Sequence, residues 1–268
     1  MFDLHVHSSF SPDASATMEE AVISALDKGL KELCFTDHID YDYPDMDIHF
    51  NLKYDLYFDT IEKLQEKYKD KILIRKGIEM GLQPHVLEKC RKDIEKHNFD
   101  FVIGSVHVVE KKDLYNSDYF DNRTQKESYE LYFEELHYMI SHYQEYNVLG
   151  HLDIIKRYGG FNTPLPLEEF KGHVISILKK IIADGKGIEL NTSGFRYNLG
   201  DYHPSLDILK IYYQLGGEII TLGSDAHRPG DIAFAFDNAI RDLHDLGFKY
   251  ICSFDKMKPI FHKIITLL

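Results

Sequence analysis

Short apolar runs recur along this chain, and nearly every one ends in a side chain that can bind a metal ion. The first run ends in His5-Val6-His7, and the last strong one ends in Asp225-Ala226-His227. The runs between them end in a further group of such residues: His38, Glu79, His107, His151 and Asn191. A single His-x-His motif carries little weight, because alternate residues of any strand share a face. Repetition at successive run ends predicts one site that holds several metal ions.

The apolar runs alternate with segments of helical pattern. Strands are predicted at 2–7, 32–36, 72–79, 101–106, 148–152, 187–190 and 219–222, with a weak further strand at 250–253. A helix is predicted between Thr17 and Gly29, and Thr17 and Glu20 have the spacing of a capping box. Further helices are predicted at 53–68, 84–97 (with a proline in its first turn), 125–145, 168–184, 205–215 and 231–246.

Seven such cycles imply an α/β fold with a parallel sheet, which is either a closed barrel or a doubly wound open sheet. An open sheet gathers its site at one switch point, whereas residues from seven strand ends need those ends to form a ring. The pattern therefore favours a barrel. No low-complexity linker or clear internal repeat divides the 268 residues, so we expect a single domain spanning 1–268.

The composition limits which binding partners and which cellular location are expected for this protein. The formal net charge of −13 argues against a nucleic-acid partner, because no general positive field is present to hold phosphates. The three cysteines are odd in number and have no CxxC spacing, which favours a reducing cytoplasm over a disulfide framework. No apolar stretch reaches membrane-spanning length and the first residues do not resemble a secretion signal, so we expect a cytoplasmic protein without a membrane partner. The oligomeric state stays open.

The strand-end motifs, taken in order, resemble the polymerase-and-histidinol-phosphatase (PHP) superfamily over the whole chain. The motifs that carry this resemblance are His5-x-His7, Thr36-Asp37-His38, Gly77-Ile78-Glu79, Gly104-Ser105-Val106-His107, Gly150-His151 and Gly223-Ser224-Asp225-Ala226-His227. Chain length and the segment from Asn191 to Arg196 are similar to the stand-alone histidinol-phosphate phosphatases of that superfamily. The resemblance implies a distorted seven-stranded (β/α) TIM-like barrel with three divalent metal ions. Imidazole with carboxylate suits zinc, with manganese or iron as the other candidates.

The resemblance also implies which residues bind the metals. The three sets are His5, His7, Glu79 and Asp225 for the first ion, Glu79 again with His107 and His151 for the second, and Asp13, His38 and His227 for the third. Glu79 would bridge the first two ions, and we assign it and Asp225 to the catalytic centre. Asp13 stands where some relatives carry histidine, so this chain keeps a ligand but changes its type.

Four residues near the predicted rim are candidate substrate contacts. Arg157 and Arg196 follow strand ends, where their guanidinium groups are suited to bind phosphate oxygens in pairs. Asn191 either orients a ligand or caps the local backbone, and His203 is either a substrate contact or a helix-start residue. The acidic aromatic segment from Asp40 to Asp45 either contacts a cationic amine and imidazole or forms a solvated lid.

Three divalent ions would attract a phosphate monoester locally, although the protein is acidic. A metal-bridging hydroxide, formed near neutral pH, would attack phosphorus in line. The resemblance implies hydrolysis of L-histidinol phosphate to L-histidinol and phosphate, a step of histidine biosynthesis. Two alternatives remain: another phosphoesterase or a nuclease of the same superfamily, and a metal-binding module without catalysis.

Overall fold

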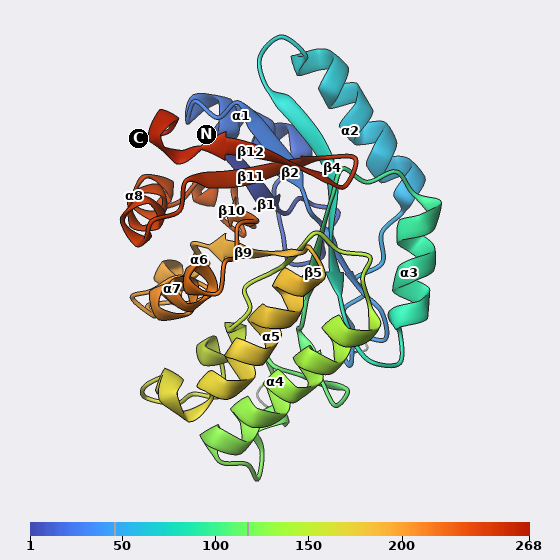
Figure 1. Cartoon of the computed structure of the whole chain (residues 1–268). Helices are drawn as coiled ribbons and strands as arrows, with labels where there is room; N and C mark the ends of the chain where they lie inside the picture. Colours follow the sequence, from blue (N-terminus) through green and yellow to red (C-terminus); the bar gives the residue numbers. More distant parts are fainter. Residues whose placement is uncertain (46, 117) are drawn as a thin grey trace.

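The computed structural model describes residues 1–45, 47–116 and 118–268, in which parallel strands and helices alternate (Figure 1). Seven strands form the main sheet, hydrogen-bonded side by side in this order: β1 (Phe2–Val6), β2 (Glu32–Phe35), β4 (Leu73–Gly81), β5 (Phe101–Ser105), β8 (Val148–Leu149), β9 (Gly187–Asn191) and β10 (Ile220–Gly223). Every pairing in this path is parallel. The predicted seven-stranded α/β barrel is confirmed.

The sheet closes on itself between β1 and β10, and this seam is irregular. Val6 forms a parallel bridge with Ala226, and the amide of His7 donates to the carbonyl oxygen of Ala226 at 2.9 Å. On its other side, β1 pairs with β2 with a register shift between Asp3 and Val6. The barrel is therefore distorted around the strand that carries the His-x-His motif.

Helices lie around the outside of the sheet (Figure 1). They are α1 (Met18–Asp27), α2 (Tyr54–Tyr68), α3 (Leu87–Lys96), α4 (Gln125–His142), α5 (Lys171–Ala183), the single-turn α6 (Ser193–Arg196), α7 (Leu206–Gln214) and α8 (Phe236–Leu246). Most strand residues are buried on both faces, as expected for parallel strands covered by helices. Thr17 and Glu20 form the predicted capping box at the start of α1.

Several boundaries differ from the sequence prediction. Pro84 is not in the first turn of α3, because it lies in a turn that the amide of Val86 closes on the carbonyl of Gln83 at 3.1 Å. The last predicted helix begins at Phe236 rather than at Asp231, since Pro229–Asp231 forms a 3-10 turn and Ala235 adopts a left-handed φ of 57°. An additional short strand, β3 (His38–Asp40), pairs with β4.

The weak strand predicted near the C-terminus is not part of the barrel wall. It is β11 (Tyr250–Asp255), which pairs antiparallel with β12 (Lys258–Lys263) in a separate sheet. At the hairpin turn, the amide of Met257 donates to the carbonyl of Asp100 at 2.9 Å, and its carbonyl accepts from Asn147 Nδ2 at 3.0 Å. Asp100 and Asn147 immediately precede β5 and β8, so the hairpin covers the amino-terminal end of the barrel. The opposite, carboxyl end is left for the metal-capable side chains.

Two short elements complete the carboxyl end of the barrel. Strands β6 (Val108–Val109) and β7 (Lys112–Asp113) form a hairpin directly after His107.

Within the described part of the chain, no helix has the length and apolar character needed to cross a membrane.

Candidate metal centre

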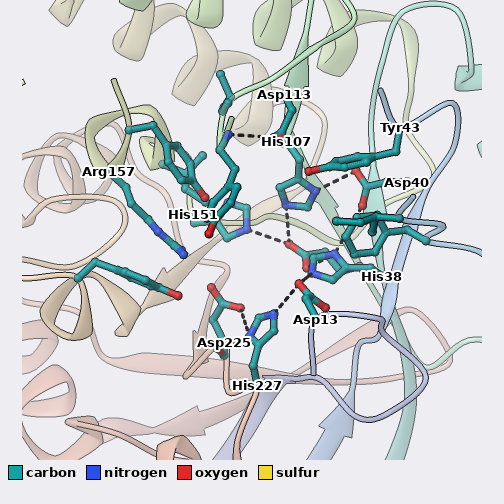
Figure 2. A pocket seen from close by; sticks show the side chains of 18 of the residues that line it. Asp13, His38, Asp40, Tyr43, His107, Asp113, His151, Arg157, Asp225 and His227 are labelled. Carbon is teal, nitrogen blue, oxygen red and sulfur yellow. Dashed lines mark hydrogen bonds and ion pairs between the residues drawn. The ribbon is translucent and has the colours of Figure 1, made fainter. Parts of the chain in front are cut away.

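The strand-end residues come together on one rim, at the bottom of a cavity (Figure 2). The structure places eight of them in four overlapping groups, whose possible ligand atoms lie within 4.8 Å of one another: His7–His38–His227, His5–His7–Asp225, His5–Glu79–His151 and His38–Glu79–His107. This convergence agrees with the prediction that the carboxyl ends of the strands share one site.

Glu79 lies at the middle of these groups. It is fully buried on β4, opposite His38 of β3 in the strand pairing. Its Oε1 lies 2.8 Å from His151 Nε2 and 3.4 Å from His107 Nε2, and its Oε2 lies 3.1 Å from both His5 Nε2 and His38 Nδ1. Burial alone would raise the pKa of Glu79, but His5 and the other histidines lower that pKa well below its ordinary value. Glu79 is therefore a charged carboxylate. Its Oε1 accepts a hydrogen bond from Ser105 Oγ at 2.7 Å, and its Oε2 has no hydrogen-bond partner among the described residues.

Asp225 provides a second buried carboxylate. Its Oδ1 lies 3.3 Å from His7 Nε2, 3.7 Å from His5 Nε2 and 3.5 Å from His227 Nδ1. Its φ of 55° is in the left-handed region, which aspartate tolerates better than most residues. Arg196 holds this turn, since Nη1 donates to the Ser224 carbonyl and Nη2 to the Asp225 carbonyl, both at 2.7 Å.

Asp13 approaches the centre from the loop after β1. Its Oδ2 lies 3.1 Å from His227 Nε2 and 3.5 Å from His38 Nε2, and its side chain is 41% exposed. The ring of His7 stacks between these two histidines, with centroids 4.3 Å from His38 and 4.2 Å from His227. The three ligand sets implied by the family resemblance are thus contiguous, and His7 and His38 each stand at a boundary between sets.

Two further carboxylates orient the histidine rings: Glu189, which the sequence analysis did not name, and Asp40, which it named only as part of the acidic segment from Asp40 to Asp45. Glu189 of β9 accepts the Nδ1 hydrogen of His5 at 2.6 Å and the amide of His151 at 3.0 Å. Asp40 of β3 accepts the Nδ1 hydrogen of His107 at 2.9 Å. Such hydrogen bonds leave the other ring nitrogen free to bind a metal ion. The sequence signal that could have indicated Glu189 is its place two residues before Asn191 in the same predicted strand, where both side chains share a face.

The buried polar atoms of this rim fit divalent metal ions. His5 Nε2, His7 Nε2, His38 Nδ1 and Glu79 Oε2 are buried and have no hydrogen-bond partner among the described residues. Leaving such atoms without a partner is unfavourable, whereas a metal ion would satisfy them together. Burial, with the neighbouring His227 and His38, lowers the pKa of His7 to about 3. His7 is therefore neutral near pH 7, which is the form that binds metals.

A cavity of about 720 Å³ opens above this centre. Arg157 and Arg196 both line it, and the sequence had singled out both. The guanidinium carbon of Arg157 lies 3.1 Å from the centre of the Tyr197 ring, and Figure 2 shows the group directed into the cavity. Arg228 also lines the cavity and was not singled out by the sequence. The cavity thus presents cationic groups beside the candidate metal centre.

Asn191 and His203 lie in the interior and are not among the residues that line the cavity. Asn191 Nδ2 donates to Glu189 at 3.1 Å, and its Oδ1 accepts the amide of Ser193 at 2.9 Å. The backbones of His203 and Asn191 form two hydrogen bonds: the Asn191 amide donates to the His203 carbonyl at 2.7 Å, and the His203 amide donates to the Asn191 carbonyl at 2.9 Å. The side-chain Nδ1 of His203 donates to Asp153 at 2.9 Å. Their observed contacts support the metal-bearing strands, and a direct substrate contact stays a prediction.

A parallel barrel whose carboxyl rim gathers histidines and carboxylates below a small-molecule cavity defines the class of metal-binding TIM-like barrels. Within that class, the chain belongs to the PHP domain family, whose model matches residues 3–193. The two ligand candidates beyond that range, Asp225 and His227, both lie in the loop after the final barrel strand β10.

Two relatives match the chain over almost its whole length. Histidinol-phosphatase of Lactococcus lactis is 32% identical over 96% of this chain and 95% of its own. A protein of Clostridium acetobutylicum named "Probable histidinol-phosphatase" is 31% identical over 93% of this chain and 95% of its own. The crystal structure of the Lactococcus lactis histidinol phosphate phosphatase, complexed with zinc, L-histidinol and phosphate, superposes with a TM-score of 0.89 at 30% identity, covering 97% of this chain and 98% of that one.

Proposed function

We propose that this protein is a zinc-dependent phosphatase that hydrolyses L-histidinol phosphate to L-histidinol and phosphate in histidine biosynthesis. The observation that carries the proposal is the set of buried histidine and glutamate atoms at the bottom of a small-molecule cavity, which have no hydrogen-bond partner in the described part of the chain. Full-length similarity to histidinol-phosphatases supports the choice of substrate. The three cysteines are buried and free, which fits the cytoplasm as the proposed location.

We propose three metal ions per chain, with the ligand sets that the family resemblance implies. We assign His5, His7, Glu79 and Asp225 to the first, Glu79 with His107 and His151 to the second, and Asp13, His38 and His227 to the third. Manganese or iron would suit the same donors. When bound, such ions would lower the pKa of coordinated water and stabilise negative charge on the phosphoryl oxygens.

The residues of the chain then have separate tasks. Glu79 and Asp225 hold the ions in place, while Glu189 and Asp40 fix the orientation of His5 and His107. Three carboxylates against three divalent ions would leave the centre positive, so it would attract a phosphate into an otherwise acidic protein. Arg157 and Arg196 are placed on the cavity wall to bind the remaining phosphate oxygens.

A substrate panel tests the proposal directly. We expect the zinc-loaded protein to hydrolyse histidinol phosphate with a kcat/KM roughly 100-fold or more above that for an aryl phosphate or a dinucleotide, because the size of the cavity suits a small monoester. Initial rates under identical metal conditions measure this. A higher kcat/KM for single-stranded DNA or another phosphoester would favour a different phosphoesterase activity, and no turnover of any ester would favour a metal-binding module.

The two arginines are expected to differ in a measurable way. Arg157 lies over the Tyr197 ring on the cavity wall, where it is proposed to bind a phosphate oxygen. Arg157→Ala is therefore expected to lower kcat/KM for histidinol phosphate roughly 10- to 100-fold with unchanged metal content. Arg196 also holds the Asp225 turn, so Arg196→Ala is expected to lower metal content as well. Kinetics and elemental analysis of both variants measure the difference. Arg241→Ala, on an exposed face of α8, is the control.

Wild-type kinetics for both Arg157→Ala and Arg196→Ala would contradict this assignment. The phosphate would then be bound elsewhere on the rim, with Arg228 as the next candidate to substitute.

A further inference from the structure

The loop that brings Asp13 to the rim, residues 7–17 between β1 and α1, contains no helix or strand. Asp13 is also the most exposed of the three proposed carboxylate ligands. Its side chain is 41% exposed, against 0% for Glu79 and 8% for Asp225. The position of Asp13, and with it the third ligand set, therefore depends on the hydrogen bonds that fix this loop.

A buried carboxylate outside the proposed ligand sets fixes the loop. Asp37 lies in the turn between β2 and β3 and is 0% exposed. Its Oδ1 accepts the Ser8 amide at 2.7 Å and the Ser11 hydroxyl at 2.8 Å, and its Oδ2 accepts the Ser8 hydroxyl at 2.8 Å. Hydrogen bonds to a buried carboxylate are among the stronger ones in proteins, so Asp37 ties the loop to the end of β2.

Ser11 connects Asp37 to two of the proposed ligand residues. While its hydroxyl donates to Asp37, its Oγ accepts the His38 amide at 3.0 Å and lies 3.5 Å from His7 Nδ1. A hydroxyl can donate one hydrogen bond and accept two, so one serine suits all three contacts. The Ser11 carbonyl also accepts the amide of Ala14 at 3.1 Å, which fixes the backbone on both sides of the aspartate ligand.

Each ligand set thus has a buried carboxylate that supports it. Glu189 supports the first set and Asp40 the second, through the hydrogen bonds described above. Asp40 Oδ2 also lies 3.5 Å from His38 Nδ1, so it reaches the third set from the ring side. Asp37 reaches the third set from the backbone side, because its hydrogen bonds run through Ser11 to the His38 amide.

We propose that Asp37 and Ser11 position the third metal ion, by fixing the loop of Asp13 and the peptide of His38 so that both side chains face one ion. The inference rests on the proposed function, from which it takes the assignment of three ions. Neither Asp37 nor Ser11 lines the cavity, so both are positioning residues rather than catalytic ones. The first ion keeps three ligands that this network does not touch: His5, Glu79 and Asp225.

Stepwise zinc binding to the metal-free protein, measured in competition with a chelator of known affinity, tests the inference. Ser11→Ala removes the hydroxyl that links Asp37 to His38. We expect it to weaken one of the three zinc sites roughly 10- to 100-fold and to change the other two by less than about 3-fold. Asp13→Ala removes the proposed ligand itself and identifies which binding step belongs to the third ion.

Ser253→Ala is the matched control. Ser253 is also a buried serine, and its Oγ lies 2.9 Å from His262 Nε2. It belongs to the β11–β12 hairpin at the opposite end of the barrel, so all three zinc affinities are expected to match those of wild type.

A second variant covers the case in which Ser11→Ala yields no folded protein. Asp37→Asn keeps the size of the side chain but replaces the charged acceptor of Ser8 and Ser11 with a neutral one. We expect it to weaken the same zinc site roughly 3- to 10-fold. Wild-type affinity at that site would overturn the inference.

Three further results would also overturn it: wild-type affinity at every site of Ser11→Ala, equal weakening of all three sites, or a wild-type protein that binds fewer than three zinc ions. None of these measurements needs turnover. A protein that hydrolyses no ester but shows the selective loss would overturn the proposed function and support the role of Asp37 and Ser11. An active phosphatase without the selective loss would do the reverse.

Discussion

Glu79→Gln is expected to lower kcat for histidinol phosphate by roughly 1,000-fold or more, because it neutralises the carboxylate shared by two of the proposed metal sites. Each Glu79 oxygen lies within 3.4 Å of at least two histidine nitrogens, so an amide nitrogen in either position would face groups arranged for a metal ion. Steady-state kinetics and elemental analysis of the purified variant measure the effect. Metal content is expected to fall together with kcat.

Glu62→Gln makes the same chemical change at a 58% exposed position on α2 and is the control. It is expected to match wild type in both measurements. A Glu79→Gln protein that keeps its full metal content and a near-normal kcat would remove Glu79 from the catalytic centre and leave the bridge assignment without support.

Metal removal is expected to abolish turnover and to destabilise the fold. The wild-type protein is expected to hold two to three divalent ions per chain, in line with the clusters of candidate ligands on the rim. Lowering free zinc from 1,000-fold above its Kd to a negligible level removes about 4 kcal/mol of unfolding free energy. For a domain of this size, Tm is then expected to fall by roughly 10 °C. Elemental analysis, phosphatase assays and thermal unfolding before and after dialysis against a chelator measure the three effects.

Returning zinc to the dialysed protein is expected to restore both Tm and turnover, which separates metal loss from irreversible damage. Fewer than one metal equivalent per chain, combined with activity that a chelator leaves unchanged, would be incompatible with the proposed mechanism.

Some features of the fold follow from the sequence because they depend on local pattern. The apolar runs and helical segments alternate with a regular period, and parallel strands joined by helices place all their carboxyl ends on one side. The sequence alone therefore assigns the residues at those ends, such as Glu79, His107 and His151, to one rim. Helix starts were less secure, since the turns at Pro84 and Ala235 depend on hydrogen bonds and backbone angles outside the helical period.

The tertiary structure alone decided which side chains support that rim. Glu189 accepts a hydrogen bond from His5, which is 184 residues away in sequence, and no periodicity connects two such positions. Sequence periodicity likewise does not indicate that the β11–β12 hairpin covers the amino-terminal end of the barrel, or that Arg196 binds the backbone of the Asp225 turn.

Residue type and position on a strand thus determined where the metal-capable groups gather. Their orientation came only from packing between distant segments, as in the hydrogen bonds of Glu189 to His5 and of Asp40 to His107. The physical reason is that strand direction is a local property of the chain, whereas the hydrogen-bond partner of a buried side chain depends on how the whole barrel closes.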